Sequence, residues 1–197
     1  MKQVGSSNYS LKYSTSLDNF FVNSTADNSI ADSFYSVPVA FAQDQLQEND
    51  SGKYSIFDIA DWFLQKENMT HKKLQKLCYY AQAWCFALKG YRLANTDFQA
   101  WIHGPVSPVL YERFKGFGCE TIKINTDRLI TFEDEDLELL EDVWETYGDK
   151  TGNALEALSQ RELPWEEARQ GYNETERCRV IIIPESMRRY YRSIYNR

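Results

Sequence analysis

Cysteine and histidine have the widest chemical repertoire in this sequence, and their spacing favours neither catalysis nor metal binding. A cysteine nucleophile needs an orienting base beside its thiol, and a zinc site needs about four ligands at close spacing. The chain has two histidines and four cysteines, Cys78, Cys85, Cys119 and Cys178, with no CxxC pair. Cys78 and Cys85 fall on the apolar stripe of a predicted helix. We therefore expect reduced thiols, no metal site, no cofactor and no enzymatic activity.

A cluster of cations at the start of the same helix is a second candidate site. His71, Lys72, Lys73 and Lys76 lie in its first two turns, where positive charge opposes the helix dipole. One interpretation is a site for an anion or an acidic partner, because the backbone N–H groups and the lysines face the same way. The other is that acidic side chains elsewhere, such as those of residues 133–145, neutralise the lysines.

A Gly-Pro pair marks a third candidate, in the segment Ala-Trp-Ile-His-Gly-Pro-Val. Gly104 and Pro105 predict a fixed turn between an extended segment and a helix, with Trp101 and Val106 anchored in the core. The structural interpretation is a rigid corner. The functional interpretation is a presented loop that contacts a partner, with His103 as its polar tip.

Two runs of charge favour structural roles. The four arginines of the C-terminal segment alternate with tyrosines, a mixture found in nucleic-acid sites, but the net charge of −7 argues against a nucleic-acid binder. The acidic run fills the exposed face of an amphipathic helix, and several of its carboxylates suit the helix N-terminus. The arginines are Arg188, Arg189, Arg192 and Arg197. The acids are Glu133, Asp134, Glu135, Asp136, Glu138, Glu141, Asp142 and Glu145.

The composition is that of a globular protein of 197 residues, with 43% hydrophobic and 15% aromatic residues. The longest stretch without a charged residue, Phe98–Tyr111, is shorter than the roughly 20 residues that span a bilayer. The N-terminus also lacks the apolar core of a secretory signal. We therefore expect a cytoplasmic protein with no membrane association.

The character of the sequence changes near residue 50, which predicts an N-terminal extension over residues 1–53 and a domain over residues 54–197. The extension is rich in serine and aromatic residues without a sustained period. This pattern predicts a flexible tail, or alternatively a small accessory element that docks on the domain or on a partner. Beyond it we expect a compact, mainly α domain of about seven helices with a small sheet of two or three strands. The helix after Thr70 is apolar nearly all round, which predicts the buried centre of the domain.

Caps and glycines predict where the elements begin and end. The expected helices cover about residues 56–66, 71–90, 107–116, 133–147, 151–160, 164–171 and the segment from Pro184 onward. We expect Thr121–Asn125 to be a strand that pairs with Arg179–Ile183. The helix over residues 133–147 is expected to bury Leu137, Leu140, Val143, Trp144 and Tyr147.

Several motifs follow one another in a fixed order along the domain. They are Thr70–Trp84, Phe98–Pro108, Ala157–Gln160, Leu163–Arg169, and the terminal Ile183-Pro184-Glu185 and Tyr190-Tyr191. Together they resemble the Panacea domain, a family that includes SocA-like antitoxins and phage-associated GepA-type proteins. The resemblance covers residues 54–197, and Gln160 stands where the family often has His. Five positions are expected to be structural: Leu77, Trp84, Trp101, Pro164 and Trp165.

The resemblance implies a non-enzymatic antitoxin that binds and neutralises a toxin protein encoded by a neighbouring gene. Relatives that deliver the toxin to a protease imply an alternative, in which this protein is an adaptor. We expect the partner-binding surface to include Lys73, Lys76, Tyr80, His103, Gly104 and Pro105. Two further alternatives are a hydrolase that uses Cys78 or Cys85 and a DNA-binding autoregulator. We expect charge reversal of Lys73 and Lys76 together to weaken partner binding and to leave the fold intact.

Overall fold

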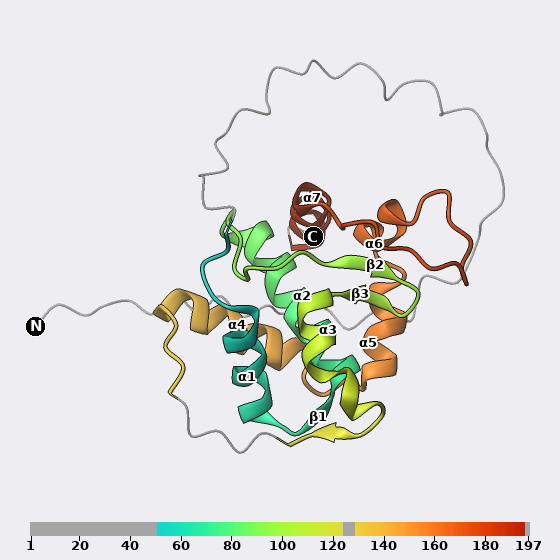
Figure 1. Cartoon of the computed structure of the whole chain (residues 1–197). Helices are drawn as coiled ribbons and strands as arrows, with labels where there is room; N and C mark the ends of the chain where they lie inside the picture. The colour runs from blue at the N-terminus through green and yellow to red at the C-terminus, as the bar shows by residue number, and fades with distance from the viewer. Residues whose placement is uncertain (1–50, 124–128, 196–197) are drawn as a thin grey trace, which may run out of the picture. The chain divides into compact units, whose positions relative to one another are not determined.

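The computed structural model describes residues 51–123 and 129–195 (Figure 1). Within these residues the chain forms seven α-helices and two small antiparallel sheets, which confirms the predicted mainly α class. Residues 1–50 of the predicted N-terminal extension lie outside the described part. The helices are α1 (Ile56–Lys66), α2 (His71–Leu88), α3 (Pro108–Phe114), α4 (Asp134–Tyr147), α5 (Gly152–Ser159), α6 (Leu163–Ala168) and α7 (Pro184–Tyr195). The strands are β1 (Met69–Thr70), β2 (Gln99–Trp101), β3 (Gly104–Val106) and β4 (Thr121–Ile122).

Local capping explains why the predicted helix starts are confirmed. The side chains of Thr70, Ser107 and Thr151 each accept a hydrogen bond from the backbone N–H three residues later, at the start of α2, α3 and α5. Such caps satisfy donors that a helix N-terminus leaves unpaired. Pro108 then occupies the first position of α3, where its missing N–H costs nothing.

Helix α2 is the buried centre of the domain, as its apolar circumference predicts. It packs against α1, α4, α5 and α7 (Figure 1). Its aromatic residues form a cluster with the neighbouring helices: the Tyr80 ring stacks on Tyr147 with 3.9 Å between centroids. The indole Nε1 of Trp84 donates a 3.1 Å hydrogen bond to the Tyr147 hydroxyl, and Tyr191 of α7 packs edge-on against Trp84.

The predicted pairing of the strands is wrong. The short strand β4 pairs with β1, with Met69 opposite Ile122. Residues 124 and 125 of the predicted strand lie outside the described part. The segment near Ile181 instead lies beside β2: Ala100 N–H donates to the Val180 carbonyl, and Ile182 N–H donates to the Phe98 carbonyl. The reason is tertiary, because α7 follows this segment directly and packs on α2, which brings the segment to the edge of β2.

The buried face of α4 also differs from the prediction. Leu140, Val143 and Tyr147 are buried as expected, but Leu137 is 37% exposed and Asp136 is fully buried. Asp136 accepts hydrogen bonds from Lys53, Lys89, Tyr54 and Tyr91. The hydrogen bonds from these four donors offset the free-energy cost of removing the carboxylate from water. The face of α4 that contains Asp136 can therefore pack against the core.

The charge on Asp136 is expected to stabilise the fold. Burial alone would raise the pKa of this carboxyl, but the hydrogen bonds from Lys53, Tyr91, Tyr54 and Lys89 outweigh it and lower the pKa to about 2. The ionised form of Asp136 is therefore more stable in the folded protein than in the unfolded chain. Asp136→Asn should lower the free energy of unfolding by about 2 kcal/mol at pH 7. Urea titrations at pH 7 and near pH 2 provide the check, because the difference from wild type should shrink as the wild-type carboxyl becomes protonated.

Among the described residues, none of the helices combines the length and the apolar character that crossing a bilayer requires.

Candidate functional site

The Gly-Pro segment forms a tight hairpin rather than a corner. Strands β2 and β3 pair with Gln99 opposite Val106 and Trp101 opposite Gly104, so the turn falls on Ile102 and His103. Gly104 opens the returning strand with φ +86°, a backbone conformation that favours glycine. The structure therefore corrects the prediction that Gly104 and Pro105 are themselves the turn.

Three side chains from the α5–α6 region hold the first half of this hairpin. Arg169 donates to the Ala100 carbonyl (3.1 Å), and the indole Nε1 of Trp165 donates to the Trp101 carbonyl (2.9 Å). The amide of Gln160 donates to the Ile102 carbonyl (2.6 Å). Gln160 stands where the resemblance predicts His, and a ring N–H is also a donor. The substitution therefore keeps the kind of hydrogen bond that the position makes here.

Two side chains of α2 hold the second half. The Nζ of Lys76 donates to the Pro105 carbonyl at 2.9 Å. The Gln75 amide pairs twice with Ser107, donating to its carbonyl (3.1 Å) and accepting from its N–H (2.9 Å). Five side chains thus fix five carbonyl groups over eight residues, from Ala100 to Ser107. We call this set the hairpin clamp: Gln75, Lys76, Gln160, Trp165 and Arg169.

Lys76 makes its clamp contact while almost completely buried. Its side chain is 1% exposed, and burial lowers its pKa to about 7, although the negative charge of Glu156 acts in the opposite direction. The Nζ and Cε of Lys76 lie so close to the hairpin that a Cβ at position 104 would come within 3.1 and 2.9 Å of them. Only glycine leaves the room that this approach needs.

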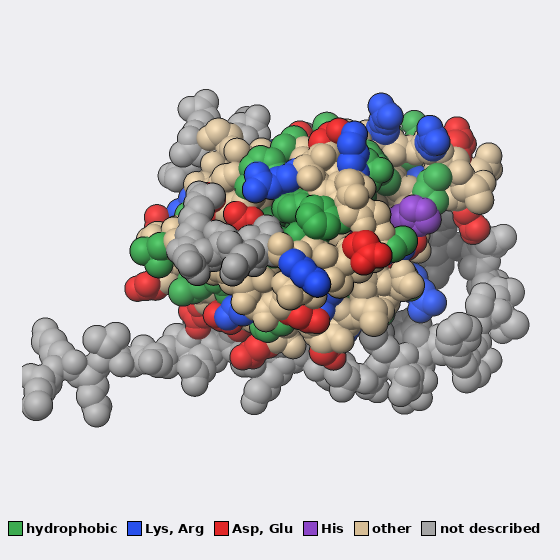
Figure 2. All heavy atoms as spheres, turned by 60° about the horizontal axis from the view of Figure 1, so that its bottom comes forward, with side chains coloured by type: hydrophobic (Ala, Val, Ile, Leu, Met, Phe, Trp, Pro, Cys, Tyr) green, Lys and Arg blue, Asp and Glu red, His purple; other side chains and the backbone are tan. Residues whose placement is uncertain are grey.

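The structure places the predicted partner-binding residues in two groups. Lys73, Lys76 and Tyr80 are buried, as are Gly104 and Pro105. The side chain of His103 is 71% exposed at the hairpin turn, and Figure 2 shows an exposed histidine at the right of the molecular face. In this conformation only His103 of the six is open to a partner; its contact with one stays a prediction.

The lysines at the start of α2 have acidic partners, but not in α4. The Nζ of Lys73 lies 2.8 Å from a carboxylate oxygen of Glu67 and donates to the Gly148 carbonyl at 2.7 Å. Lys72 pairs with Glu156 of α5 at 2.5 Å. The second carboxylate oxygen of Glu156 lies 2.7 Å from Nδ1 of His103. Neutralisation of the lysines is thus the observed arrangement, and the residues that achieve it differ from the predicted acidic helix.

A buried carboxyl that no sequence signal indicated joins three helices beside the clamp. Glu162 precedes α6 and is 5% exposed. It accepts hydrogen bonds from Tyr191 of α7 (2.6 Å) and from Tyr80 of α2 (3.4 Å). Burial raises the pKa of Glu162 to about 8, although both tyrosine hydroxyls act in the opposite direction. The hydrogen bond from Tyr80 therefore fixes the residue that directly precedes α6, the helix that contains the clamp residue Trp165.

The cysteines lie in surroundings that oppose nucleophilic chemistry. Cys78, Cys85 and Cys178 are buried free thiols, and Cys119 is an exposed one. Burial raises the pKa of the Cys78 thiol, and it raises the pKa of Cys85 to about 12. A reactive cysteine needs the opposite shift. Within the described ranges, no group of three or more His, Cys, Asp or Glu side chains is placed to hold a metal ion.

The tight packing at Gly104 gives a direct test of the clamp. In Gly104→Ala the new Cβ would meet the Ser159 hydroxyl at 2.8 Å and Lys76 Cε at 2.9 Å, in a backbone conformation that strains alanine by about 1–2 kcal/mol. We expect the variant to lose about 2–3 kcal/mol of unfolding free energy and to exchange its hairpin amides faster. Gly116→Ala is the matched control, because a Cβ there meets nothing within 4 Å. Equal stability of the two variants would contradict the clamp.

Comparison with known proteins bears on the part of the chain that contains the clamp. Residues 74–166 match the family model described as "Antitoxin SocA-like, Panacea domain", which confirms the resemblance seen in the sequence. The matched region runs from α2 into α6, so it contains the hairpin and every clamp residue except Arg169. No curated protein and no solved structure matches the chain.

Proposed function

From the antitoxin-like domain over residues 74–166, we propose that this protein neutralises a toxin by binding it directly. The observation that carries the proposal is the hairpin clamp, which lies almost entirely within the matched region. Its side chains hold one hairpin, whose turn exposes His103, in a single shape through hydrogen bonds from α2, α6 and the end of α5. A preorganised surface loses less conformational entropy when a partner binds. The arrangement is therefore suited to recognition of another protein.

The chemistry of the domain supports binding rather than turnover. The two cysteines considered as nucleophiles, Cys78 and Cys85, lie in the core of α2 with raised thiol pKa values. The hydrogen-bond donors of the clamp are directed at backbone carbonyl groups of the chain itself. These groups serve to position a surface, and His103 is the polar side chain that the hairpin turn presents.

Co-expression tests the proposal. The product of each neighbouring gene is expressed from an inducible promoter, with and without the full chain, and growth is measured. We expect one product to arrest growth, the full chain to restore it, and the two proteins to co-purify. Gly104→Ala should weaken the rescue, whereas Gly116→Ala should keep it. If no neighbouring product is neutralised, or if rescue occurs without any complex, the proposal is wrong.

The lifetime of the toxin distinguishes sequestration from delivery to a protease. After protein synthesis is stopped, a sequestered toxin should persist in the complex at undiminished level. An adaptor should instead shorten the lifetime of the toxin in wild-type cells but not in cells that lack the protease. We expect persistence, because a preorganised binding surface is sufficient for sequestration. Protease-dependent loss of the toxin would favour the adaptor alternative.

A further inference from the structure

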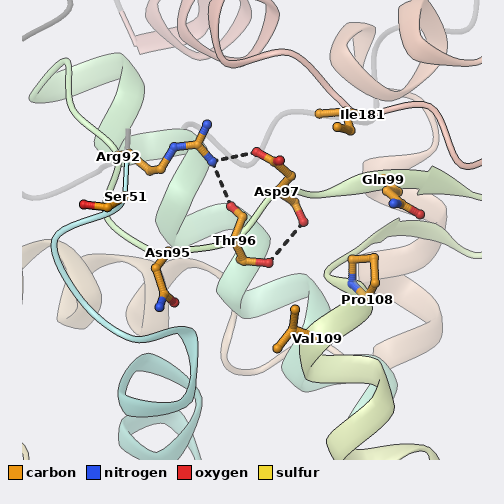
Figure 3. Close-up of a pocket in the computed structure, with 9 residues that line it drawn as sticks. All are labelled: Ser51, Arg92, Asn95, Thr96, Asp97, Gln99, Pro108, Val109 and Ile181. Atoms are coloured by element: carbon orange, nitrogen blue, oxygen red, sulfur yellow. Dashed lines mark hydrogen bonds and ion pairs between the residues drawn. The ribbon is translucent and has the colours of Figure 1, made fainter. Parts of the chain in front are cut away.

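Two hollows follow one another along the outer face of β2. The first, of about 440 Å³, lies between Ile181 and the start of α3, with Asp97 and Gln99 between them (Figure 3). Val109 and Pro108 form its α3 side (Figure 3). The position of Ile181 follows from its pairing with Gln99. The hollow therefore has strand β2 as its floor and two elements distant in sequence as its walls.

The second hollow, of about 460 Å³, continues this arrangement toward the hairpin turn. Trp101 of β2 lines it, with Tyr111 of α3 on one side and residues 177–179 on the other. The two hollows adjoin at β2, where the indole Nε1 of Trp101 donates to the Gln99 side chain at 2.8 Å. We call the pair the β2 groove. Strand residues rise by about 3.3 Å each, so its course from position 97 to 101 measures about 13 Å, which suits an extended segment of about four residues.

The first hollow is lined mainly by polar residues, and its apolar contacts come from two exposed aliphatic side chains. Val109 is 50% exposed and Ile181 is 44% exposed, and they face each other across the hollow (Figure 3). Arg92, which also lines this hollow, is paired with Asp97 at 2.7 Å. Burial of the two aliphatic side chains by a partner would be favourable, by about 25 cal/mol for each Å² of apolar surface covered.

The second hollow has a basic rim. Arg177 and Arg179 are both exposed, and within residues 51–123 and 129–195 neither has an ion-pair partner. The acidic residue of this hollow, Glu112, is paired with Lys115 at 2.5 Å. Figure 2 shows several basic side chains at the upper right of the molecular face, with acidic side chains among them. Arg177 and Arg179 line this hollow together with two aromatic side chains and, within the part of the chain that the structure describes, have no carboxylate partner, so they complement an acidic ligand.

We propose that the β2 groove binds an extended segment of the toxin that carries an apolar residue followed by acidic residues. The apolar residue packs between Val109 and Ile181, and the acidic side chains pair with Arg177 and Arg179. The inference rests on the proposed function, because the occupant belongs to the toxin. It adds the place of binding and the chemistry of the segment that is recognised.

Charge reversal at the rim tests the groove. The full chain with Arg177→Glu and Arg179→Glu is compared with wild type in its dissociation constant for the toxin, at two salt concentrations. We expect binding to weaken about tenfold, with a smaller salt dependence, because two exposed ion pairs are lost. Lys123→Glu with Arg161→Glu is the matched control, since both residues are exposed and neither lines the groove. Unchanged affinity of the groove variant would overturn the inference.

The first hollow is tested separately by Val109→Asp. Position 109 lies in the first turn of α3, where an acid suits the helix dipole, so the fold should keep its thermal midpoint. Toxin binding should weaken about fivefold through lost burial and repulsion of the acidic segment. Short overlapping peptides that tile the toxin identify the occupant, and an acidic peptide should compete with the toxin only for the wild-type groove. Competition by peptides without acidic residues would contradict the charge argument.

The outcomes separate failure of this inference from failure of the proposed function. If wild type and the Arg177/Arg179 variant bind the toxin equally, the toxin is recognised elsewhere and only the groove assignment is wrong. If wild type binds no neighbouring product, the proposed function fails as well. A dimer of this chain that the variant dissociates would assign the groove to a second copy, and salt-sensitive DNA binding that the variant abolishes would assign it to nucleic acid. Each of these two results would overturn the inference.

Discussion

At pH 7, Lys76→Glu is expected to have a free energy of unfolding about 4 kcal/mol lower than that of Lys76→Met, which carries no charge at this position. The side chain of Lys76 is almost completely buried against the hairpin, with Nζ directed at the Pro105 carbonyl. A carboxylate in that place would face a carbonyl oxygen instead of donating to it, and Glu156 adds a second negative charge nearby. Burial and the charge of Glu156 raise the pKa of the new carboxyl by about three units, so the carboxyl must take up a proton when the chain folds. Each unit costs about 1.4 kcal/mol.

Lys76→Met is the matched control for this experiment. Methionine keeps most of the aliphatic stem and introduces no charge, so it loses one hydrogen bond to the Pro105 carbonyl, at about 1 kcal/mol. It also removes the cost of burying an amine whose pKa is lowered to about 7, so we expect Lys76→Met to be at least as stable as wild type at pH 7. Urea titrations followed by tryptophan fluorescence measure both variants. A Lys76→Glu protein as stable as Lys76→Met would show that the side chain reaches solvent, which would contradict a buried clamp. The sequence led us to expect that charge reversal at Lys73 and Lys76 leaves the fold intact; the burial of Lys76 indicates the opposite.

Local signals in the sequence were sufficient for the helices. Thr70 and Ser107 cap α2 and α3 through their own side chains, and caps of this kind depend on residues only a few positions apart. The apolar circumference of α2 likewise predicted its central place without knowledge of the partners. Leu77 and Trp84, which we expected to be structural, are both fully buried.

Buried charge is where prediction from the sequence failed, because the groups that compensate it come from distant positions. Amphipathic patterning assigns an acid such as Asp136 or a lysine such as Lys76 to the surface. The buried carboxylate of Asp136 accepts hydrogen bonds from donors more than 40 residues away in sequence. The buried amine of Lys76 donates to a carbonyl 29 residues away. One signal was visible for Lys76: a cation in the early turns of a helix opposes the dipole. Glu162 gave no signal, since its environment is built by α2 and α7.

The candidate site shows the same division between local and distant information. The motif around Gly104 was visible in the sequence, and so was the exposure of His103 as its tip. The donors to the hairpin carbonyls were not, because Gln160, Trp165 and Arg169 lie about 60 to 70 positions further along the chain. Motifs that the sequence shows as separate segments thus act on one hairpin. This common target explains physically why they occur together.

Glu162→Gln is expected to change how the stability of the domain depends on pH. In the folded protein Glu162 holds its proton up to about pH 8, because burial raises its pKa from the model-peptide value of 4.5. Between these two pH values the native state binds one more proton than the unfolded state, so wild-type stability should fall as pH rises from about 4.5 to 8. Glutamine cannot ionise and keeps a polar group for the hydroxyls of Tyr80 and Tyr191.

The variant and wild type should therefore have similar stability near pH 4.5, and the variant should be more stable at pH 8, by on the order of 4 kcal/mol. The informative quantity is the difference in free energy of unfolding between the two proteins. Lys76 contributes a pH dependence opposite to that of Glu162, and this contribution is present in both proteins. Its pKa of about 7 lies below the ordinary lysine value of 10.5, so its contribution to stability rises with pH above 7 and cancels in the difference. Glu112→Gln, at an exposed ion pair, should keep the wild-type profile. If Glu162→Gln also keeps that profile, the carboxyl is ionised in the folded protein, and solvent or a cation must reach the junction of α2, α6 and α7.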